Sequence, residues 1–356
     1  MEKINGFSIF VGEVLSEKKK AYIKMMKEHG FKGVFTSLHI PEDDSSLYLE
    51  RLISLGKLTK ELDLTLMVDI SAKALEAISI DIESRDDLLR LKEYGITGIR
   101  MDYGIEMALI AKVSRIMTVG LNASTLTEQE FAQLTKNNAD FSQMELWHNY
   151  YPRENTGLAK TSFIATNQWL IGKGLKVVAF APGDKKLRGP LYNHLPTLEK
   201  HRNLHPLACA LELKQACYVE DVYIGDEELS QELALQFMTY ELEMKLLFYV
   251  TIYSDTYKDL FIGCHTNRVD DARDVIRSQE ARFKKLPQIQ QENSIIRNCG
   301  AITLDNQLYG RYMGELQVAK QTLLADSRVN VVAQIKAKDE ALIQFIKPGT
   351  KFEFRQ

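Results

Sequence analysis

Residues 98–122 read GIRMDYGIEMALIAKVSRIMTVGLN and contain one complete strand–helix–strand unit. The segments Gly98–Asp102 and Ile116–Asn122 are short and mainly apolar, which is typical of strands buried in a parallel sheet. Between them, Ile105–Val113 carries apolar residues at helical spacing. This stretch therefore predicts two parallel strands joined by a crossover helix.

The same unit repeats along the N-terminal part of the chain. Further segments with strand character are Phe7–Gly12, Gly33–Leu38, Leu64–Asp69, Phe141–His148, Leu175–Ala181 and Val219–Gly225. Helical patterns cover Ser16–His29, Leu47–Leu62, Ile82–Tyr94, Thr127–Asn137, Ser162–Lys173, Pro206–Ala216 and Glu227–Leu247. Eight strands that alternate with helices predict a closed α/β barrel, the (β/α)8 TIM barrel, which takes ~250 residues.

The pattern changes near residue 248. Short β-rich pieces follow at Phe248–Tyr253, Gly300–Leu304, Val329–Ile335 and Ala341–Ile346, and a charged helical pattern covers Asp270–Lys284. We therefore predict a TIM-barrel domain over residues 1–247 and a small, mainly β domain over residues 248–356.

Composition narrows the classes of partner. The 356 residues are 45% hydrophobic and 26% charged, and the net charge of −3 gives no reason to expect a nucleic acid. No apolar run reaches the ~20 residues that a membrane span needs, and residues 1–10 lack the pattern of a secretory signal. The four cysteines are scattered, which favours free thiols in a reducing cytoplasm. Neither a metal spacing nor a dinucleotide or phosphate glycine fingerprint is present, so we expect no cofactor and no metal.

Carboxylates follow two neighbouring predicted strands, at the barrel edge where chemistry takes place in this fold. Asp69 and Asp102 occupy these positions. A pair of carboxylates that flanks the scissile bond is the standard equipment of glycoside hydrolysis. Capping of the following helix is an equally reasonable role for either residue.

Further polar residues lie at other strand ends. Asn122 ends the fifth strand and suits binding of a hydroxyl or acetamido group. Asp226 follows the eighth strand and can either bind a ligand or cap the next helix. The segment ELWHNYYP, residues 145–152, includes His148 and Asn149 among aromatic residues, a mixture that fits a sugar ring. A backbone hydrogen bond is the alternative role for His148.

Basic residues gather in the long segment Pro182–Asn203, after the seventh strand. The candidates for binding an anion are Arg188, His201 and Arg202, since TIM barrels often bind phosphate in the loops after strands seven and eight. In the second domain, the segment LYGRYMGELQVA, residues 308–319, includes Arg311. We expect this segment to complete the active site; a stabilising lid or a dimer surface is the alternative.

Several motifs together resemble one bacterial family. They are Phe7-Ser-Ile-Phe, Phe35-Thr-Ser-Leu, Val68-Asp-Ile-Ser, Gly98-Ile-Arg-Met-Asp-Tyr-Gly, Leu121-Asn-Ala-Ser, His148-Asn-Tyr-Tyr-Pro-Arg, Arg188-Gly-Pro-Leu-Tyr, Pro196-Thr-Leu-Glu-Lys-His-Arg and Tyr309-Gly-Arg-Tyr-Met-Gly-Glu-Leu-Gln. With these motifs, nearly the whole chain resembles the 6-phospho-N-acetylmuramidases. The resemblance implies a TIM barrel followed by a cyclophilin-like domain. It also implies cytoplasmic hydrolysis of the β-1,4 bond between 6-phospho-N-acetylmuramic acid and N-acetylglucosamine, in cell-wall recycling.

The expected partner is thus a small phosphorylated disaccharide, and the sequence leaves a homo-oligomer open. We expect Asp69 and Asp102 to be the acid and base, and the other polar candidates to bind substrate. A sugar-phosphate aldolase or isomerase is an alternative, but none of the eight predicted strands ends in the lysine that a Schiff-base aldolase needs. A non-catalytic phosphosugar-binding protein is the other alternative.

Overall fold

The computed structural model describes residues 5–12, 14–37, 47–70, 80–101, 104–283 and 287–356. The chain divides into two compact units, Met1–Ala234 and Leu235–Gln356. None of the helices in these described ranges is long and apolar enough to cross a membrane.

The first unit is a closed barrel of eight parallel strands, each paired with the next. The barrel closes where β8 pairs with β1, with Phe7 opposite Ile224. The strands are β1 (Asn5–Ser8), β2 (Gly33–Ser37), β3 (Thr65–Ile70), β4 (Gly98–Met101), β5 (Thr118–Asn122), β6 (Met144–Trp147), β7 (Lys176–Ala181) and β8 (Asp221–Ile224). The predicted TIM barrel is confirmed.

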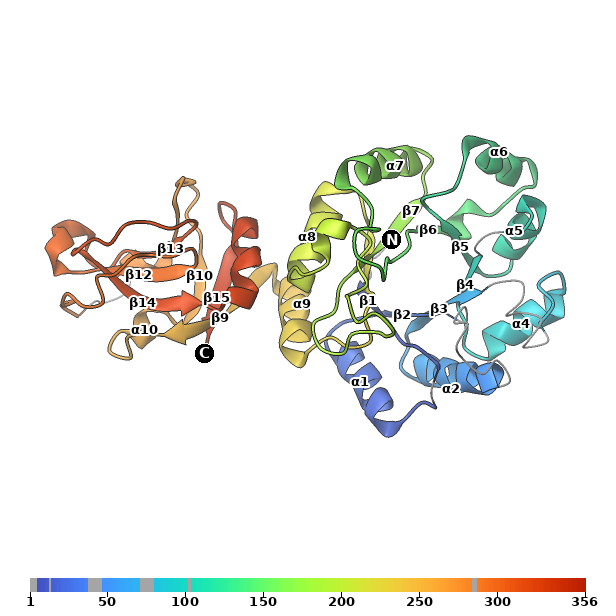
Figure 1. The fold of residues 1–356 in the computed structure, drawn as a ribbon, viewed down its shortest axis with the longest axis horizontal. Helices are drawn as coiled ribbons and strands as arrows, with labels where there is room; N and C mark the ends of the chain where they lie inside the picture. Colours follow the sequence, from blue (N-terminus) through green and yellow to red (C-terminus); the bar gives the residue numbers. More distant parts are fainter. Residues whose placement is uncertain (1–4, 13, 38–46, 71–79, 102–103, 284–286) are drawn as a thin grey trace. The chain divides into compact units, whose positions relative to one another are not determined.

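Helices surround the barrel on its outside (Figure 1). They are α1 (Glu17–Glu28), α2 (Tyr48–Glu61), α4 (Arg85–Glu93), α5 (Met107–Ser114), α6 (Glu128–Lys136), α7 (Lys160–Gly172), α8 (Pro206–Ala216) and α9 (Gln231–Glu243). Local sequence fixes several of their starts. The Ser16 side chain accepts a hydrogen bond from the backbone of Lys19, and Thr127 forms a reciprocal capping box with Glu130 at the start of α6.

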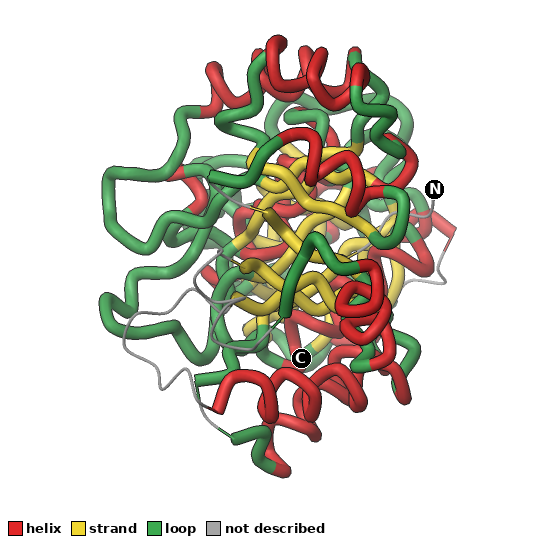
Figure 2. The backbone as a smooth tube through the Cα atoms, turned by 90° about the vertical axis from the view of Figure 1, so that its right-hand side faces the viewer, coloured by secondary structure: helices red, strands yellow, loops and turns green. Residues whose placement is uncertain are grey.

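Large side chains fill the inside of the barrel, which is therefore a packed core. The cluster comprises Phe35, Met67, Trp147, Val178, Phe180 and Tyr223. Glycines make room for the largest of them: a Cβ atom at Gly6 or Gly33 would lie 2.1 Å from the Tyr223 ring or hydroxyl. In the view of Figure 2 the strands lie inside the layer of helices.

The second unit contains a seven-stranded, mostly antiparallel sheet with the order β10-β15-β9-β14-β12-β13-β11. Its strands are β9 (Lys245–Ile252), β10 (Gly263–Thr266), β11 (Val275–Arg277), β12 (Ala301–Asp305), β13 (Leu316–Ala319), β14 (Val329–Ile335) and β15 (Lys351–Arg355). Its helices are short: α10 (Lys258–Phe261) and the 3-10 segments η4 (Glu280–Phe283), η5 (Gln307–Tyr312) and η6 (Ala337–Phe345). The prediction of a mainly β second part is confirmed.

Three local predictions in this region were wrong. Residues 245–247 do not continue the helix, because Lys245–Leu247 pairs with β15 as the start of β9. The domain boundary expected after residue 247 stays a prediction; that residue lies within β9, and the compact units meet within α9. Asp270–Lys284 contains β11 and η4 in place of one helix, and most of Ala341–Ile346 is the 3-10 segment η6, not a strand.

Candidate active site

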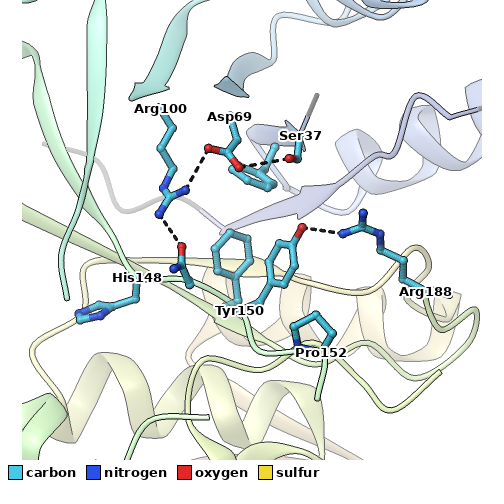
Figure 3. A pocket seen from close by; sticks show the side chains of 10 residues that line it. Ser37, Asp69, Arg100, His148, Tyr150, Pro152 and Arg188 are labelled. Carbon is cyan, nitrogen blue, oxygen red and sulfur yellow. Dashed lines mark hydrogen bonds and ion pairs between the residues drawn. The ribbon is translucent and has the colours of Figure 1, made fainter. Parts of the chain in front are cut away.

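A cavity of about 290 Å³ lies at the carboxyl ends of the barrel strands (Figure 3). The parallel strands end at the same edge, so side chains from several distant segments of sequence meet there. The described lining residues are Phe35, Ser37, Asp69, Arg100, His148, Asn149, Tyr150, Pro152, Phe180 and Arg188.

Asp69, on β3, is the only acidic residue among the described lining residues. Its two carboxylate oxygens have different partners. The Ser37 hydroxyl donates to Oδ2 over 3.1 Å, and Arg100 Nη1 donates to Oδ1 over 3.0 Å. These bonds follow from the barrel register, because Asp69 lies opposite Ser37 on β2 and opposite Arg100 on β4. The carboxylate is thus fixed, while 15% of its side chain remains exposed.

Arg100 also contacts the segment after β6. Its Nη2 donates to Asn149 Oδ1 over 2.5 Å, so one guanidinium joins Asp69 to Asn149. The Arg100 side chain is almost fully buried, and it lies opposite Gly120 on β5.

His148 has a buried ring with both nitrogens engaged. The Asn167 amide nitrogen donates to the carbonyl of Cys217, which turns Asn167 Oδ1 toward His148 Nε2 at 2.7 Å. Nε2 therefore carries the proton, and Nδ1 accepts from the Ser124 hydroxyl at 2.9 Å. Burial lowers the pKa of His148 to about 4, so the imidazole is neutral at pH 7.

Arg188 provides a cation on the other side of the cavity (Figure 3). Its guanidinium carbon lies 3.9 Å from the centre of the Phe10 ring, and Nη1 donates to the Tyr150 hydroxyl over 2.6 Å. Burial raises the pKa of Tyr150, with the charge of Arg188 acting in the opposite direction. Because the phenol oxygen accepts from Arg188, its own O–H can donate to a bound anion.

Two predicted ligand-binding residues lie elsewhere on this edge. Asn122 accepts a hydrogen bond from the backbone of Ser124 and lines a second cavity of about 650 Å³. That cavity is lined by Met101, Gly104, Ile105, Met107, Ile110, Leu121, Asn122, Thr125, Leu126 and Glu130. Asp226 is fully buried and lines neither cavity; its Oδ2 accepts from the backbones of Gly183 and Leu195. Asp226 therefore holds both ends of the segment that carries Arg188.

His201 and Arg202 also lie outside both cavity linings. His201 Nε2 contacts Glu212 at 2.6 Å, and burial lowers the pKa of its ring. Arg202 contacts Glu199 at 2.6 and 2.7 Å and donates to backbone carbonyls of the two neighbouring loops. His201 Nδ1 is buried without a hydrogen-bond partner among the described residues, and Arg202 lines a third cavity of about 400 Å³, so anion binding by these two residues stays a prediction.

Two further candidates, Asp102 and Arg311, do not lie among the described residues of the cavity lining. Asp102 lies outside the described residues. Arg311 is on η5 in the second unit, where its exposed guanidinium stacks on Tyr312 at 4.9 Å. Among the described residues, no group of three or more His, Cys, Asp and Glu side chains is placed to hold a metal ion.

Comparisons with known proteins agree with this architecture. Sequence models of the 6-phospho-N-acetylmuramidase family match both parts of the chain, the N-terminal model over residues 5–239 and the C-terminal model over residues 242–355. The chain belongs to the 6-phospho-N-acetylmuramidase family. It is a glycosidase of this family, as the resemblance implied.

Two solved structures resemble this muramidase family member over its full length. One is a conserved protein of unknown function from Enterococcus faecalis, with 44% identity, a TM-score of 0.90, and coverage of 99% of this chain and 96% of that one. The other is an uncharacterized B. cereus protein, with 25% identity, a TM-score of 0.74 and complete coverage of both chains, 100%. A search of curated proteins gave no match.

Sequence reasoning missed three polar residues that line the cavity: Ser37, Arg100 and Tyr150. For Arg100 a signal was present, because it is the only charged residue in the short strand Gly98–Met101. Tyr150 lies in the aromatic segment 145–152 that was expected to fit a sugar ring, whereas Ser37 had no comparable signal, since a serine in a strand is common. Their places depend on which strands become neighbours in the barrel.

Proposed function

We propose that this glycosidase hydrolyses the β-1,4 bond between 6-phospho-N-acetylmuramic acid and N-acetylglucosamine. The observation that carries the proposal is the cavity at the strand ends, which holds the Asp69 carboxylate and the Arg188 cation in one lining. Family membership supplies the class of reaction. None of the described lining residues is a lysine, which speaks against Schiff-base chemistry in this cavity.

Asp69 and Asp102 form the acid–base pair in this proposal. Glycoside hydrolysis needs one carboxyl group on the leaving oxygen and a second on the opposite side of the anomeric carbon. Asp69 is held by Ser37 and Arg100 and still reaches the cavity, as a reacting carboxylate must. Asp102 follows β4, the strand next to β3 in the barrel.

Arg188 and Tyr150 bind the 6-phosphate. A guanidinium matches the oxygens of a phosphate, and the Tyr150 hydroxyl adds a donor beside it. The cavity, at about 290 Å³, lies at the lower end of the ~300–1,000 Å³ of ligand pockets, so we place the phosphorylated ring in it.

We also propose that the enzyme acts in the cytoplasm, on sugars recovered from the cell wall. A sugar 6-phosphate carries close to two negative charges at neutral pH and does not leave the cell by diffusion. A phosphorylated disaccharide is therefore the small-molecule partner.

Incubation of the full chain with the disaccharide, with and without its 6-phosphate, tests this proposal. We expect release of N-acetylglucosamine, detected by mass spectrometry, from the phosphorylated compound at a much higher rate. The Asp69→Asn variant shows whether the release depends on this site. Absence of release from the phosphorylated disaccharide, or equal rates for both compounds, would refute the proposal.

A further inference from the structure

Arg100 is buried at the centre of the cavity wall and contacts groups from two different segments. It donates to Asp69 on β3 and to Asn149 after β6. The barrel accommodates this side chain through Gly120, where a Cβ atom would lie 3.2 Å from Arg100 Cβ and 3.0 Å from Trp147 Cδ1. A side chain at position 120 would therefore press on Arg100 and Trp147.

The chemistry of arginine determines how the Asn149 amide must be turned. A guanidinium has donors and no acceptor, so Asn149 presents its oxygen to Arg100 and its Nδ2 group points to the other side. Within the described part of the chain, that Nδ2 group has no hydrogen-bond partner, and Asn149 lines the cavity. The result is a fixed donor that is available to a ligand.

We propose that Arg100 is a positioning residue that orients the Asn149 amide, and that Asn149 Nδ2 donates to the carbonyl oxygen of the 2-acetamido group of the substrate. This inference rests on the proposed function, which supplies an N-acetylated sugar. Asn149 is then a specificity determinant for acylated sugars, and Arg100 acts through it.

The charges near Asn149 favour a neutral acceptor over the lactyl carboxylate of muramic acid. Arg100 already contacts the Asp69 carboxylate, so the pair has no net charge. A second carboxylate beside Asn149 would meet the negative charge of Asp69, while Arg188, the other cation among the described lining residues, is assigned to the 6-phosphate. The carbonyl oxygen of an acetamido group accepts a hydrogen bond without this repulsion.

Binding measurements on the full chain with three sugar phosphates test the inference. Calorimetry compares N-acetylmuramic acid 6-phosphate, N-acetylglucosamine 6-phosphate and glucose 6-phosphate, which has a hydroxyl in place of the acetamido group. The wild type should bind N-acetylglucosamine 6-phosphate about tenfold more tightly than glucose 6-phosphate. Asn149→Asp keeps an oxygen for Arg100 but lacks the donor, so this preference should be lost. The negative charge added by Asn149→Asp weakens the binding of both sugar phosphates alike. The ratio of the affinities for N-acetylglucosamine 6-phosphate and glucose 6-phosphate is therefore free of this effect.

Arg100→Gln should also lower the preference, because glutamine can offer Asn149 either a donor or an acceptor. Arg100→Lys, which keeps a donor-only cation, should restore part of it. A purely structural role of Arg100 would weaken all three ligands equally and leave the ratio unchanged. Asn203→Asp, at an exposed asparagine that does not line the cavity of Asn149, is the matched control.

Two results would overturn the inference. One is an unchanged acetamido preference in Asn149→Asp. The other is a loss in Asn149→Leu, which lacks the donor and adds no charge, of a wild-type preference for N-acetylmuramic acid 6-phosphate over N-acetylglucosamine 6-phosphate, which would assign the donor to the lactyl group. If the wild type binds none of the sugar phosphates, the proposed function fails as well. A wild type that binds and discriminates, with variants that keep its preference, refutes this inference alone.

Discussion

Asp69 is the residue whose chemical role has the clearest structural support. In Asp69→Asn the amide oxygen can still accept from Arg100, and the amide NH2 group can donate to the Ser37 hydroxyl oxygen in place of accepting from it. We therefore expect the variant to fold while kcat falls by ~10²–10⁴, as for loss of a general acid or base. Asp102→Asn should behave alike.

Activity and thermal unfolding of the same preparations decide this prediction. Asp63→Asn is the control, because Asp63 has a fully exposed side chain and a positive φ of 51° that asparagine also tolerates. Wild-type turnover in Asp69→Asn would remove Asp69 from the acid–base pair.

Replacement of Arg188 tests the recognition of the phosphate separately from catalysis. Loss of a charge-assisted contact costs ~1.5–3 kcal/mol, so Arg188→Ala should raise KM for the phosphorylated disaccharide by about 10- to 100-fold. The slow reaction of the unphosphorylated disaccharide should change little. Arg153→Ala, at an exposed arginine after β6, is the control. Equal losses on both substrates would mean that Arg188 holds its loop through Phe10 and Tyr150.

His148 should make the folded state sensitive to acid. Burial lowers its pKa from 6.5 to about 4, so the unfolded chain binds a proton more readily than the folded protein does. Its neutral form therefore supports the fold above pH 6.5, and this contribution is lost as the pH falls toward 4. At pH 5 the effect is about 2 kcal/mol relative to pH 7.

Urea unfolding of the wild type and His148→Gln at pH 7 and pH 5 tests this effect. The free energy of unfolding of the wild type should fall by about 2 kcal/mol more than that of the variant. His29→Gln, at the C-cap residue that follows α1, controls for loss of a histidine. Parallel pH dependences in the wild type and His148→Gln would show that His148 does not titrate in this range.

Of the predicted residues that line the cavity, Arg188 comes from the long segment after β7, and the others come from strand ends. Asp69, His148 and Asn149 line the cavity because they stand at or just after strand ends, which the apolar pattern locates. Arg202 differs, since its hydrogen bonds go to backbone carbonyls of loops whose paths the sequence does not specify. The sequence shows which residues can bind an anion, but not which are already satisfied by the protein.

At the scale of elements, the loops after β6 and β7 depend on a common anchor. Glu199 accepts from the backbones of Asn155 and Gly157, and Arg202 joins Glu199 to the carbonyls of Tyr151 and Asn193. These loops carry Asn149 and Arg188, which line the cavity.

Arg202→Met should therefore loosen both loops. Without Arg202, Glu199 and the backbone carbonyls of Tyr151 and Asn193 lose this donor, so amide hydrogen exchange should rise in residues 150–157 and 182–195. Lys200→Met, at a more exposed neighbour, should have a smaller effect. Unchanged exchange in these loops in Arg202→Met would show that other contacts hold them.

Element type was predicted best where the pattern is long and repeated. The (β/α)8 alternation gives a consistent sequence signal, whereas Lys245–Ile252 is an apolar run that fits either a helix or a strand. This run forms a strand because it pairs with β15, which is over 100 residues away in the chain. The same absence of local information explains the errors at Asp270–Lys284 and Ala341–Ile346.

At the scale of the whole molecule, the chain consists of two units with separate sheets, and separate family models match the two parts. The expectation that the second part takes part in catalysis stays a prediction. It concerns Arg311, whose exposed guanidinium contacts the Tyr312 ring and donates to its hydroxyl over 2.8 Å. Arg311→Ala should leave the fold intact, because this contact is on the surface.

If Arg311 contacts the substrate, Arg311→Ala in the full chain raises KM for the phosphorylated disaccharide about tenfold. Arg273→Ala, at another exposed arginine of the second unit, should leave KM unchanged. A chain that ends after Met244 keeps all barrel strands and α9 but lacks the second sheet, so it should fold and bind N-acetylmuramic acid 6-phosphate more weakly in calorimetry. Wild-type binding by this barrel, together with a wild-type KM in Arg311→Ala, would confine catalysis to the first unit.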